Sequence, residues 1–316
     1  MGHAVESQAA AHFLTERYGP GVGGVTELGG GDWSRAFAFR LDNRDLVARF
    51  GRYREDFARD RQAMVFARPE LPVPKVLEVG EALDGFYAIS ERHFGVFLEN
   101  LEEPGWRNIL PALLRGLDTL RGIPPPGSGT DWMDEGEATA SGWRQWLIAS
   151  LKDQPGERVG GWRARLKEDP YLNDLYLSGE RAVHSLLGAC PEVRHLLHRD
   201  LLHRNVLVAE DASRLVAVFD WGCSMVGDFL YEVAWFTFWA PWHPELDALC
   251  FRRVIEDHYR AIGLQVDYFT ERLSCYEIQI GLEHLAYSAF TGREEDLYAV
   301  ARRTVQVLHD SPLGGG

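Results

Sequence analysis

Short apolar runs of β type dominate the chain up to about residue 89, and a single stretch of helical spacing lies among them. Branched and aromatic residues recur there over four to six positions, which is typical of strands. Beyond about Phe97 long helical patterns take over, and one β-hairpin interrupts them. The early elements are predicted to be three strands and one helix: Ala36–Leu41, Leu46–Phe50, Phe86–Ile89 and Phe57–Phe66.

This change of pattern predicts an α+β fold with a small β-rich N-terminal lobe and a larger, mostly helical C-terminal lobe. We place the boundary so that residues 1–94 form the first lobe and residues 95–316 the second. The N-terminus lacks the basic start and apolar run of a signal peptide, and no later stretch is apolar over the roughly 18 residues that a membrane span needs. We therefore expect a cytoplasmic protein without a membrane segment. We also expect a monomer rather than an oligomer.

The composition excludes some classes of partner. The 316 residues carry a formal charge of −14, whereas a protein that grips nucleic-acid phosphates needs clustered Lys and Arg. An acidic surface also keeps ordinary proteins soluble, so the charge alone does not identify a cationic partner. The cysteines form no CxxC pair, which argues against a zinc site or a disulfide framework and predicts reduced core residues: Cys190, Cys223, Cys250 and Cys275.

A glycine-rich run before the first predicted strand is a candidate phosphate-binding turn. Glycine lets the backbone approach a ligand closely, so the amides of Gly30 and Gly31 and the Ser34 hydroxyl could lie over phosphates. The spacing does not match G-x-G-x-x-G, and a plain loop is the alternative. Arg49, at the end of the second predicted strand, could reach the same phosphates or extend to solvent. Asp60, on the following helical stretch, could orient Arg49 by an ion pair or face water.

The segment His198–Asn205 carries the most specific pattern, because it matches H-R-D-L-x-x-x-N at every specified position. Two apolar runs, Val206–Val208 and Leu215–Phe219, follow it and are joined by a polar turn, which predicts a β-hairpin. Asn205 enters the first strand and Asp220 leaves the second. Antiparallel pairing would therefore bring both side chains to one end of the hairpin, where they could hold a cation.

These side chains fit the chemistry of phosphoryl transfer. Magnesium takes oxygen ligands and completes its shell with water and substrate phosphates, so the Asn205 amide oxygen and the Asp220 carboxylate would suffice. Asp200, on the loop that approaches the same end, could accept the proton of an attacking hydroxyl. Each of the three could be a turn or cap residue if it stood alone. Arg204 could contact solvent, phosphate or substrate.

This arrangement resembles the aminoglycoside phosphotransferase family, relatives of the protein kinases, in which an H-G-D-x-x-x-x-N loop and a later D-W segment serve these roles. Within the family the chain is most similar to the branch that acts on hygromycin B. The similarity covers most of the chain and is carried by six segments: Ser34–Phe37, Pro191–Leu196, Phe219–Trp221, Met225–Asp228, Tyr231–Ala234 and Ile280–Glu283. The resemblance implies a bilobal, protein-kinase-like fold.

The resemblance also implies roles for particular residues. Asp200 would be the catalytic base, Asn205 and Asp220 would bind Mg2+, and ATP, or alternatively GTP, would donate the phosphoryl group. Arg49 would stand where most kinases have a phosphate-binding lysine, and the branch that acts on hygromycin B carries arginine here too. The adenine-binding hinge would be formed by the backbone of Ser90, Glu91, Arg92 and His93.

After Arg49, a second position departs from the usual pattern. Arg199 stands where antibiotic kinases usually have a small residue, which makes the loop look more like that of a protein kinase. However, Asp220-Trp221-Gly222 runs directly into Gly227-Asp228, with no A-P-E segment and little room for an activation loop. Peptide phosphorylation is therefore not expected.

Candidates for the acceptor side are scattered along the second lobe. Aromatic side chains could stack on sugar rings, and carboxylates could bind ammonium groups, with core packing or solvent contact as the alternative. The candidate acceptor contacts are Asp200, Arg204, Glu232, Trp235, Trp239 and Glu283.

The resemblance implies a reaction in which ATP, with Mg2+, gives its γ-phosphoryl group to a hydroxyl of an aminoglycoside antibiotic, with hygromycin B as the first candidate. Phosphorylation would inactivate the antibiotic. A cationic small molecule would then be the partner, and neither nucleic acid nor a membrane would be one. The alternatives are a kinase of another small molecule, such as a macrolide, an amino alcohol or a sugar, and a nucleotide-binding pseudokinase.

Overall fold

The computed structural model describes residues 5–127, 131–132, 142–154 and 156–314. The chain forms two compact units: residues 1–119 with 200–224, and residues 120–199 with 225–316. The predicted catalytic loop is therefore divided, since Asp200 begins the second segment of the first unit and Arg199 belongs to the second unit. The lobe boundary after residue 94, the monomeric state and the cytoplasmic location stay predictions.

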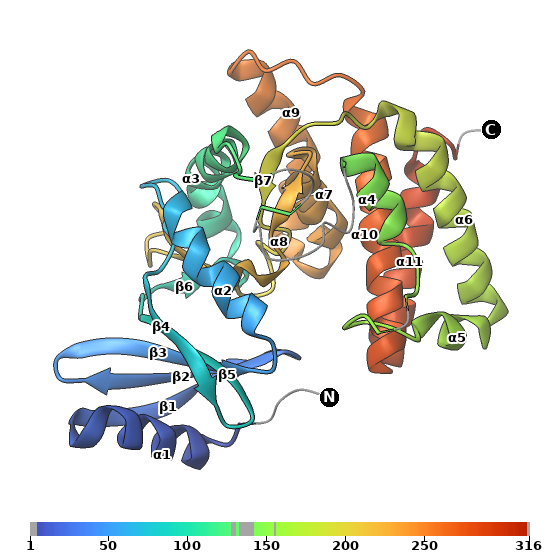
Figure 1. Cartoon of the computed structure of the whole chain (residues 1–316). Coiled ribbons are helices and arrows are strands. Elements are labelled where there is room, and N and C mark those ends of the chain that lie inside the picture. The colour runs from blue at the N-terminus through green and yellow to red at the C-terminus, as the bar shows by residue number, and fades with distance from the viewer. Residues whose placement is uncertain (1–4, 128–130, 133–141, 155, 315–316) are drawn as a thin grey trace. The chain divides into compact units, whose positions relative to one another are not determined.

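A five-stranded antiparallel sheet occupies the N-terminal part of the first unit (Figure 1). The three predicted strands are confirmed as β2, β3 and β5, but the sequence does not predict β1 or β4. β1 is largely exposed and rich in glycine, which is depleted in strands, so no apolar pattern marks it. The strand order is β1-β2-β3-β5-β4, with β1 Val22–Gly30, β2 Ser34–Leu41, β3 Arg44–Gly51, β4 Val76–Ala82 and β5 Gly85–Glu91.

Two helices cover opposite faces of this sheet, because successive side chains of a strand point to opposite sides. Helix α2 (Arg54–Ala63) packs Phe57 against Ala88 of β5. Helix α1 (Ser7–Tyr18) packs Leu14 on the other face. The large buried side chains of that second face are Phe37, Phe39, Phe50, Tyr87 and Ile89. The helix predicted around residues 57–66 is confirmed, although its end is a 3-10 turn.

One carboxylate fastens α1 to the sheet. Glu78 of β4 accepts hydrogen bonds from Arg17 Nη2 at 2.8 Å and from the Tyr18 hydroxyl at 2.8 Å, both at the end of α1. It also accepts one from the Tyr87 hydroxyl of β5. Partial burial raises the pKa of Glu78, but these hydrogen bonds outweigh it and the net shift is downward. The ionised carboxylate is therefore the form that the folded chain favours.

The predicted hairpin is confirmed and belongs to a three-stranded sheet with order β6-β8-β9. Its strands are Val96–Phe97 (β6), Val206–Val208 (β8) and Leu215–Val218 (β9). Gly95 precedes β6, and a Cβ atom at this position would lie 2.3 Å from the Val208 carbonyl oxygen. Glycine is therefore required where the segment from the first sheet meets the hairpin.

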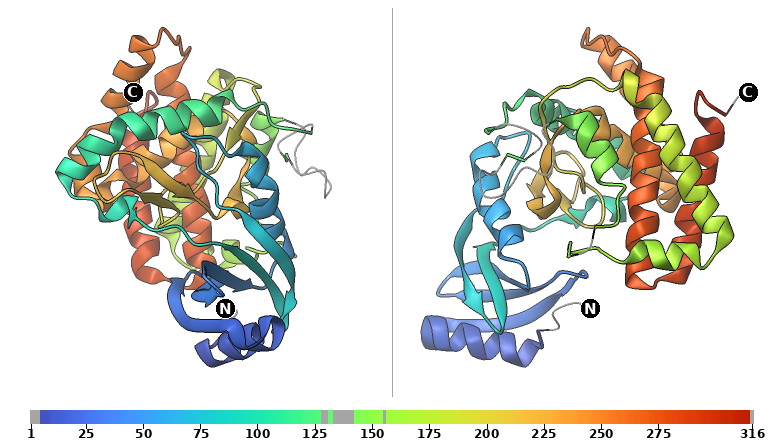
Figure 2. Two further views of the ribbon diagram at one scale, coloured as in Figure 1. Left: turned by 90° about the vertical axis from the view of Figure 1, so that its left-hand side faces the viewer. Right: turned by 45° about the vertical axis from the view of Figure 1, so that its right-hand side comes forward.

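The second unit is mostly helical and is centred on α10 (Phe269–Thr291). Helices α6, α7 and α11 pack around α10, which is buried on nearly all sides (Figures 1 and 2). Helix α3 (Glu103–Gly122) leads from the first unit into the second. The other elements are α4 Trp143–Ala149, α5 Trp162–Lys167, α6 Pro170–Leu186, β7 His195–Leu197, β10 Met225–Gly227, α7 Leu230–Trp239, α8 Pro244–Asp247, α9 Phe251–Ala261 and α11 Glu294–Asp310.

A buried ion pair joins the start of α7 to α10. Asp228 is fully buried and accepts hydrogen bonds from Arg272 at 2.6 and 2.8 Å and from the Tyr276 hydroxyl at 2.5 Å. Such a charge can be buried only when it is paired and hydrogen-bonded, as it is here. Asp228 therefore has a structural role within the second unit.

The cysteines only partly match the expectation. All four are free thiols, and Cys190 and Cys275 are buried as predicted. Cys223 and Cys250 are exposed, so the prediction of core residues is wrong for these two. Among the residues that the structure describes, no helix is both long enough and apolar enough to cross a membrane.

Replacing Glu78 by Gln should lower the free energy of unfolding at neutral pH by about 1 kcal/mol, because charge-assisted hydrogen bonds from α1 and β5 are lost. A carboxyl whose folded pKa is lowered stabilises the fold fully above its unfolded pKa of about 4.3. That stabilisation disappears as the pH falls through the folded pKa. The difference between wild type and Glu78→Gln in thermal unfolding midpoint should therefore shrink below about pH 4. Glu81→Gln, an exposed residue of the same strand, should show no such difference at any pH.

Candidate active site

The Asp200 carboxylate is held by its own loop. Asn205 Nδ2 donates to Asp200 Oδ2 at 2.8 Å and to the Asp200 carbonyl oxygen at 2.9 Å. His203 Nδ1 lies 2.7 Å from Asp200 Oδ1. Burial lowers the pKa of His203, but the hydrogen bond and charge of Asp200 outweigh it, and the net shift is upward. The carboxylate is thus oriented from both oxygens.

The loop from Asp200 to Asn205 has an unusual backbone conformation. His203 and Arg204 have φ angles of 62° and 68°, in the left-handed region that non-glycine residues rarely adopt. The Glu99 carboxylate stabilises this conformation, because its Oε1 accepts a hydrogen bond from the Arg204 backbone N–H at 2.7 Å. Burial raises the pKa of Glu99, and no described residue donates to its buried Oε2. Sequence reasoning missed Glu99, since it lies 105 residues before its partner and belongs to no motif.

Arg204 was a candidate contact for substrate or phosphate. Its guanidinium lies over the Phe97 ring, with the central carbon 5.2 Å from the ring centroid. Phe97 belongs to β6, which pairs with the hairpin. The side chain of Arg204 therefore packs against the sheet that carries the loop, and its contact with a substrate stays a prediction.

The two predicted metal ligands lie at the same end of the hairpin. Val206 pairs with Val218, and the Phe219 N–H donates to the Asn205 carbonyl oxygen at 3.1 Å. Asp220 is the next residue, has a φ of 64° and keeps a side chain that is 39% exposed. Both contacts from Asn205 to Asp200 are made by its amide nitrogen. The structure describes no hydrogen bond to the other amide atom, Asn205 Oδ1.

These oxygens fit Mg2+. An amide oxygen and a carboxylate are hard ligands of the kind that Mg2+ prefers, and few protein ligands are needed when water and phosphates complete the shell. Within the described part of the chain, no group of three or more His, Cys, Asp or Glu is placed to hold a metal. The candidate cation site is the pair Asn205 and Asp220, an amide oxygen and a carboxylate.

Arg49 connects the sheet to this end of the hairpin. Its guanidinium donates to Asp60 Oδ2 at 2.6 Å, lies 3.0 Å from Asp220 Oδ1, and is 3.4 Å from the Ser34 hydroxyl. The other Asp60 oxygen accepts from the Trp221 N–H at 2.7 Å. The ion pair expected between Arg49 and Asp60 is present, and Asp60 also fixes the chain directly after Asp220.

Burial and neighbouring charges shift the pKa values of Arg49 and Asp60. Burial lowers the pKa of Arg49, but the charges of Asp220 and Asp60 outweigh it and the net shift is upward, so the guanidinium stays protonated. Burial raises the pKa of Asp60 to about 6, and the charge of Arg49 limits that shift. The Arg49 guanidinium thus lies between the carboxyl groups of Asp60 and Asp220, at 2.6 and 3.0 Å.

The glycine-rich run forms a tight turn between β1 and β2. The Gly31 N–H donates to the Ser34 carbonyl oxygen at 3.0 Å, so this amide is used within the turn and is not directed at a ligand. A Cβ atom on Gly30 would lie 2.7 Å from the same oxygen, which explains the glycine. The Gly31 amide is therefore engaged within the turn and its contact with phosphates stays a prediction, while the Ser34 hydroxyl lies beside Arg49.

Most of the predicted hinge is occupied by backbone pairing. Ser90 pairs with Val47 of β3, and the N–H groups of Glu91 and Arg92 donate to Lys75 and Asp45 carbonyl oxygens at 3.0 and 3.1 Å. These two amides are engaged within the first unit, and the contact of this segment with a nucleotide base stays a prediction. The structure describes no partner for the His93 N–H or for its buried Nε2 atom. His93 is the member of the segment that can still offer its amide.

The predicted acceptor residues of the second unit are mostly enclosed. Glu232 is 2% exposed, and its Oε1 accepts from the N–H groups of His198 and Arg199 at 2.5 and 2.8 Å. Trp235 and Trp239 are 4% and 7% exposed, with ring centroids 6.1 Å apart. Contact of these three residues with an acceptor finds no support in this geometry, because they are buried. Trp235 and Trp239 belong to the packing of α7, and Glu232 holds the backbone at His198 and Arg199.

Glu283 was the fourth candidate of this kind. Both of its carboxylate oxygens are bound by Arg199 Nη2, at 2.9 and 2.8 Å. The Glu283 carboxylate, which was expected to bind an ammonium group of the acceptor, is therefore paired with Arg199 within the chain.

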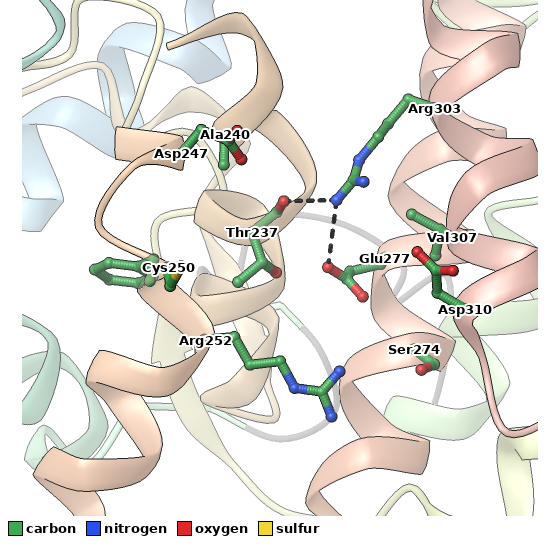
Figure 3. Close-up of a pocket in the computed structure, with 11 residues that line it drawn as sticks. Thr237, Ala240, Asp247, Cys250, Arg252, Ser274, Glu277, Arg303, Val307 and Asp310 are labelled. Carbon is green, nitrogen blue, oxygen red and sulfur yellow. Dashed lines mark hydrogen bonds and ion pairs between the residues drawn. The ribbon is translucent and has the colours of Figure 1, made fainter. Parts of the chain in front are cut away.

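A separate cavity of about 210 Å3 lies within the second unit among α7, α9, α10 and α11 (Figure 3). Arg303 of α11 lines this cavity. Its guanidinium donates to the Thr237 carbonyl oxygen at 2.8 Å and lies 3.9 Å from the Glu277 carboxylate. Its lining contains none of the residues that the sequence predicts for the active site. The residues predicted for the base, the cation site and the phosphate contact lie instead in the Asp200 loop and around Arg49, in the first unit.

Comparison with solved structures defines the class of this fold. The chain superposes with a TM-score of 0.83 and 29% identity on a thermostable mutant of aminoglycoside phosphotransferase APH(4)-Ia in ternary complex with AMP-PNP and hygromycin B, over 98% of this chain and 99% of that one. It also matches aminoglycoside 2'-phosphotransferase-IIIa with a TM-score of 0.64 at 15% identity, over 96% and 98% of the two chains, which shows shared fold alone. The fold is the kinase-like α+β fold of these phosphotransferases.

The family follows from sequence comparison. Residues 24–263 match the model of the phosphotransferase enzyme family (APH), which is well over half of the chain. The chain is 31% identical over 294 residues to hygromycin-B 4-O-kinase of Escherichia coli, covering 90% of this chain and 80% of that protein. The chain belongs to the phosphotransferase enzyme family and is a small-molecule kinase.

Replacing Arg49 by Met should destabilise the fold by roughly 3–5 kcal/mol, because it leaves the buried Asp60 carboxyl without its cation. Arg44→Met is the matched control on the same strand, since Arg44 is 57% exposed and lies 3.5 Å from Glu91. It should have little effect. Urea unfolding measures both, and adding Asp60→Asn to Arg49→Met should recover part of the loss. Equal stability of the two single variants would show that Arg49 does not organise this region.

Proposed function

We propose that this kinase transfers the γ-phosphoryl group of Mg·ATP to a hydroxyl of an aminoglycoside antibiotic, with hygromycin B as the acceptor, and thereby inactivates it. One observation carries the proposal: four residues, Asp200, Asn205, Asp220 and Arg49, belong to one compact unit and are linked by short contacts. Asn205 contacts Asp200 at 2.8 Å, and Arg49 lies 3.0 Å from Asp220 and 2.6 Å from Asp60. Phe219, which precedes Asp220, donates to the Asn205 carbonyl oxygen at 3.1 Å. A base, a cation site and a fixed positive charge are the parts that phosphoryl transfer needs.

Asp200 is the proposed base. Asn205 donates to Oδ2, and Oδ1 lies 2.7 Å from Nδ1 of His203, whose side chain is 40% exposed. An acceptor hydroxyl would take the place of His203 at Oδ1. As its oxygen bonds to the γ-phosphorus, the O–H bond breaks and the proton passes to Asp200, while the bond from phosphorus to the β-phosphate oxygen breaks. The remaining hydrogen bond keeps the carboxylate aligned during this step.

Asn205 and Asp220 would hold Mg2+, which supplies charge neutralisation at the phosphates when it is bound. Arg49, already placed beside Asp220, would add a second positive charge at the same phosphates. Its planar guanidinium has five N–H donors, so it can keep one carboxylate while turning another N–H to a phosphate oxygen. The His93 amide is the proposed contact for adenine.

The acceptor is proposed from the relatives and from charge. The protein at 31% identity is a hygromycin-B 4-O-kinase, and the matching APH(4)-Ia structure contains hygromycin B and an ATP analogue. The chain carries a formal charge of −14, and complementary charge would favour the encounter with a polycation. Kinase activity on another small molecule is the alternative, because the donor site is common to all such enzymes.

A coupled assay of ADP release tests the proposal. Wild-type protein with ATP and Mg2+ should turn over hygromycin B, and should be silent with macrolides, amino alcohols and simple sugars. Activity should be lost when EDTA removes the metal. Turnover of another acceptor class alone would keep the kinase and discard hygromycin B.

Asp200→Asn should reduce kcat by roughly 100-fold or more, because the base is lost, while Mg·ATP binding measured by calorimetry is retained. Glu210→Gln, in the polar turn at the far end of the hairpin, is the control and should keep the wild-type rate. A wild-type rate for Asp200→Asn would remove Asp200 from the proposed role.

A further inference from the structure

Arg199, the residue that departs from the usual pattern of the family, is anchored by three helices of the second unit. Its Nη2 contacts both carboxylate oxygens of Glu283 on α10, at 2.9 and 2.8 Å. Its guanidinium lies over the rings of Trp146 on α4 and Tyr231 on α7, at 4.5 and 5.4 Å from their centroids. The Tyr231 hydroxyl also donates to Glu283 at 3.2 Å. The Arg199 side chain is only 15% exposed, so this is an enclosed contact set.

The backbone of Arg199 is held as firmly as its side chain. Its φ angle is 66°, in the left-handed region, where a side chain with a Cβ atom costs roughly 1–2 kcal/mol. The buried Glu232 of α7 compensates by accepting the N–H groups of His198 and Arg199 on one oxygen, at 2.5 and 2.8 Å. A small residue at position 199 could adopt this backbone, but it could not make the contacts to α4 and α10.

Arg199 is bonded directly to Asp200, so their Cα atoms lie about 3.8 Å apart and the plane of the peptide between them is shared. Any rotation of the Arg199 backbone therefore moves the Asp200 carboxylate. Misplacement of a catalytic group by about 1 Å can reduce a rate by about 100-fold. An anchor at residue 199 consequently acts on the base although it does not touch the reacting atoms.

We propose that Arg199 is a positioning residue for the catalytic base, whose side chain, held by Glu283 and the Trp146 and Tyr231 rings, fixes the backbone that carries Asp200. This inference rests on the proposed role of Asp200. It also reassigns Glu283 from a ligand of the cationic acceptor to the partner of Arg199.

The second unit offers a matched control in Arg163. This residue is also partly enclosed, pairs with Glu180 at 3.0 Å, and lies over the Tyr176 ring at 4.4 Å. It differs in that it lies at the start of α5 and far along the chain from Asp200. Arg199→Ala and Arg163→Ala therefore remove the same chemistry, an Arg–Glu pair with a stacked ring, and only the first is attached to the catalytic loop.

The experiment compares kcat, KM for ATP, and amide hydrogen exchange of residues 196–205 in wild type and both variants. Arg199→Ala should lower kcat by roughly 10- to 100-fold and leave KM for ATP little changed, because the base and not the nucleotide is displaced. Exchange at the His198 and Arg199 amides should become faster. Arg163→Ala should keep the wild-type kcat and the wild-type exchange of this segment, even if its unfolding midpoint falls.

Two further measurements distinguish the proposed role of Arg199 from a general loss of folding, and hydrogen exchange tests it without an acceptor. Guanidinium ion at millimolar concentration should partly restore kcat in Arg199→Ala. Arg199→Lys keeps the charge but loses the stacked plane, and it should lie between wild type and Arg199→Ala in both kcat and exchange. If wild type turns over no aminoglycoside, the acceptor proposal fails while the exchange measurement still decides the inference. Unchanged exchange and kcat in Arg199→Ala, or equal losses in Arg199→Ala and Arg163→Ala, would overturn it.

Discussion

The burial of Arg49 is the constraint on which the rest of the site depends. A guanidinium with a side chain only 14% exposed must be paired, because an isolated charge in that position would be costly. Asp60 and Asp220 provide the pairing, one from α2 and one from the chain after β9. Since Asp60 also binds the Trp221 amide, the sheet, the helix and the hairpin end are tied at one point. The same charge that holds these segments together is the one that phosphates would meet.

The proposed catalytic loop depends on a second group of carboxylates, which accept hydrogen bonds from its backbone amides. Glu232 binds the amides at its start and Glu99 binds the amide of Arg204 near its end. Between these anchors the residues Arg199, His203 and Arg204 take left-handed backbone conformations that would not persist unsupported. The conformation of the loop is therefore specified by long-range contacts, although the residues proposed for chemistry belong to one short motif.

This division explains what the sequence could predict. Asp200, Asn205 and Asp220 were predictable because a local motif and one hairpin bring them together, and the pairing of Arg49 with Asp60 lies within neighbouring elements. Glu99 and the partners of Arg199 were not, because their contacts join segments 33 to 105 residues apart in sequence. β1 was missed because glycine and exposure remove its apolar pattern. The sequence also does not show that the Glu232 and Glu283 carboxylates already have partners within the chain, and their contact with an acceptor stays a prediction.

The central claim is that a phosphoryl group passes from ATP to the antibiotic, and the mass of the product tests it most directly. Hygromycin B incubated with the wild-type chain and Mg·ATP should gain the mass of one phosphoryl group, in step with the ATP consumed, and should lose its activity against sensitive cells. Consumption of ATP with hygromycin B recovered unmodified would contradict the account, because the γ-phosphoryl group would then pass to water and not to the acceptor hydroxyl.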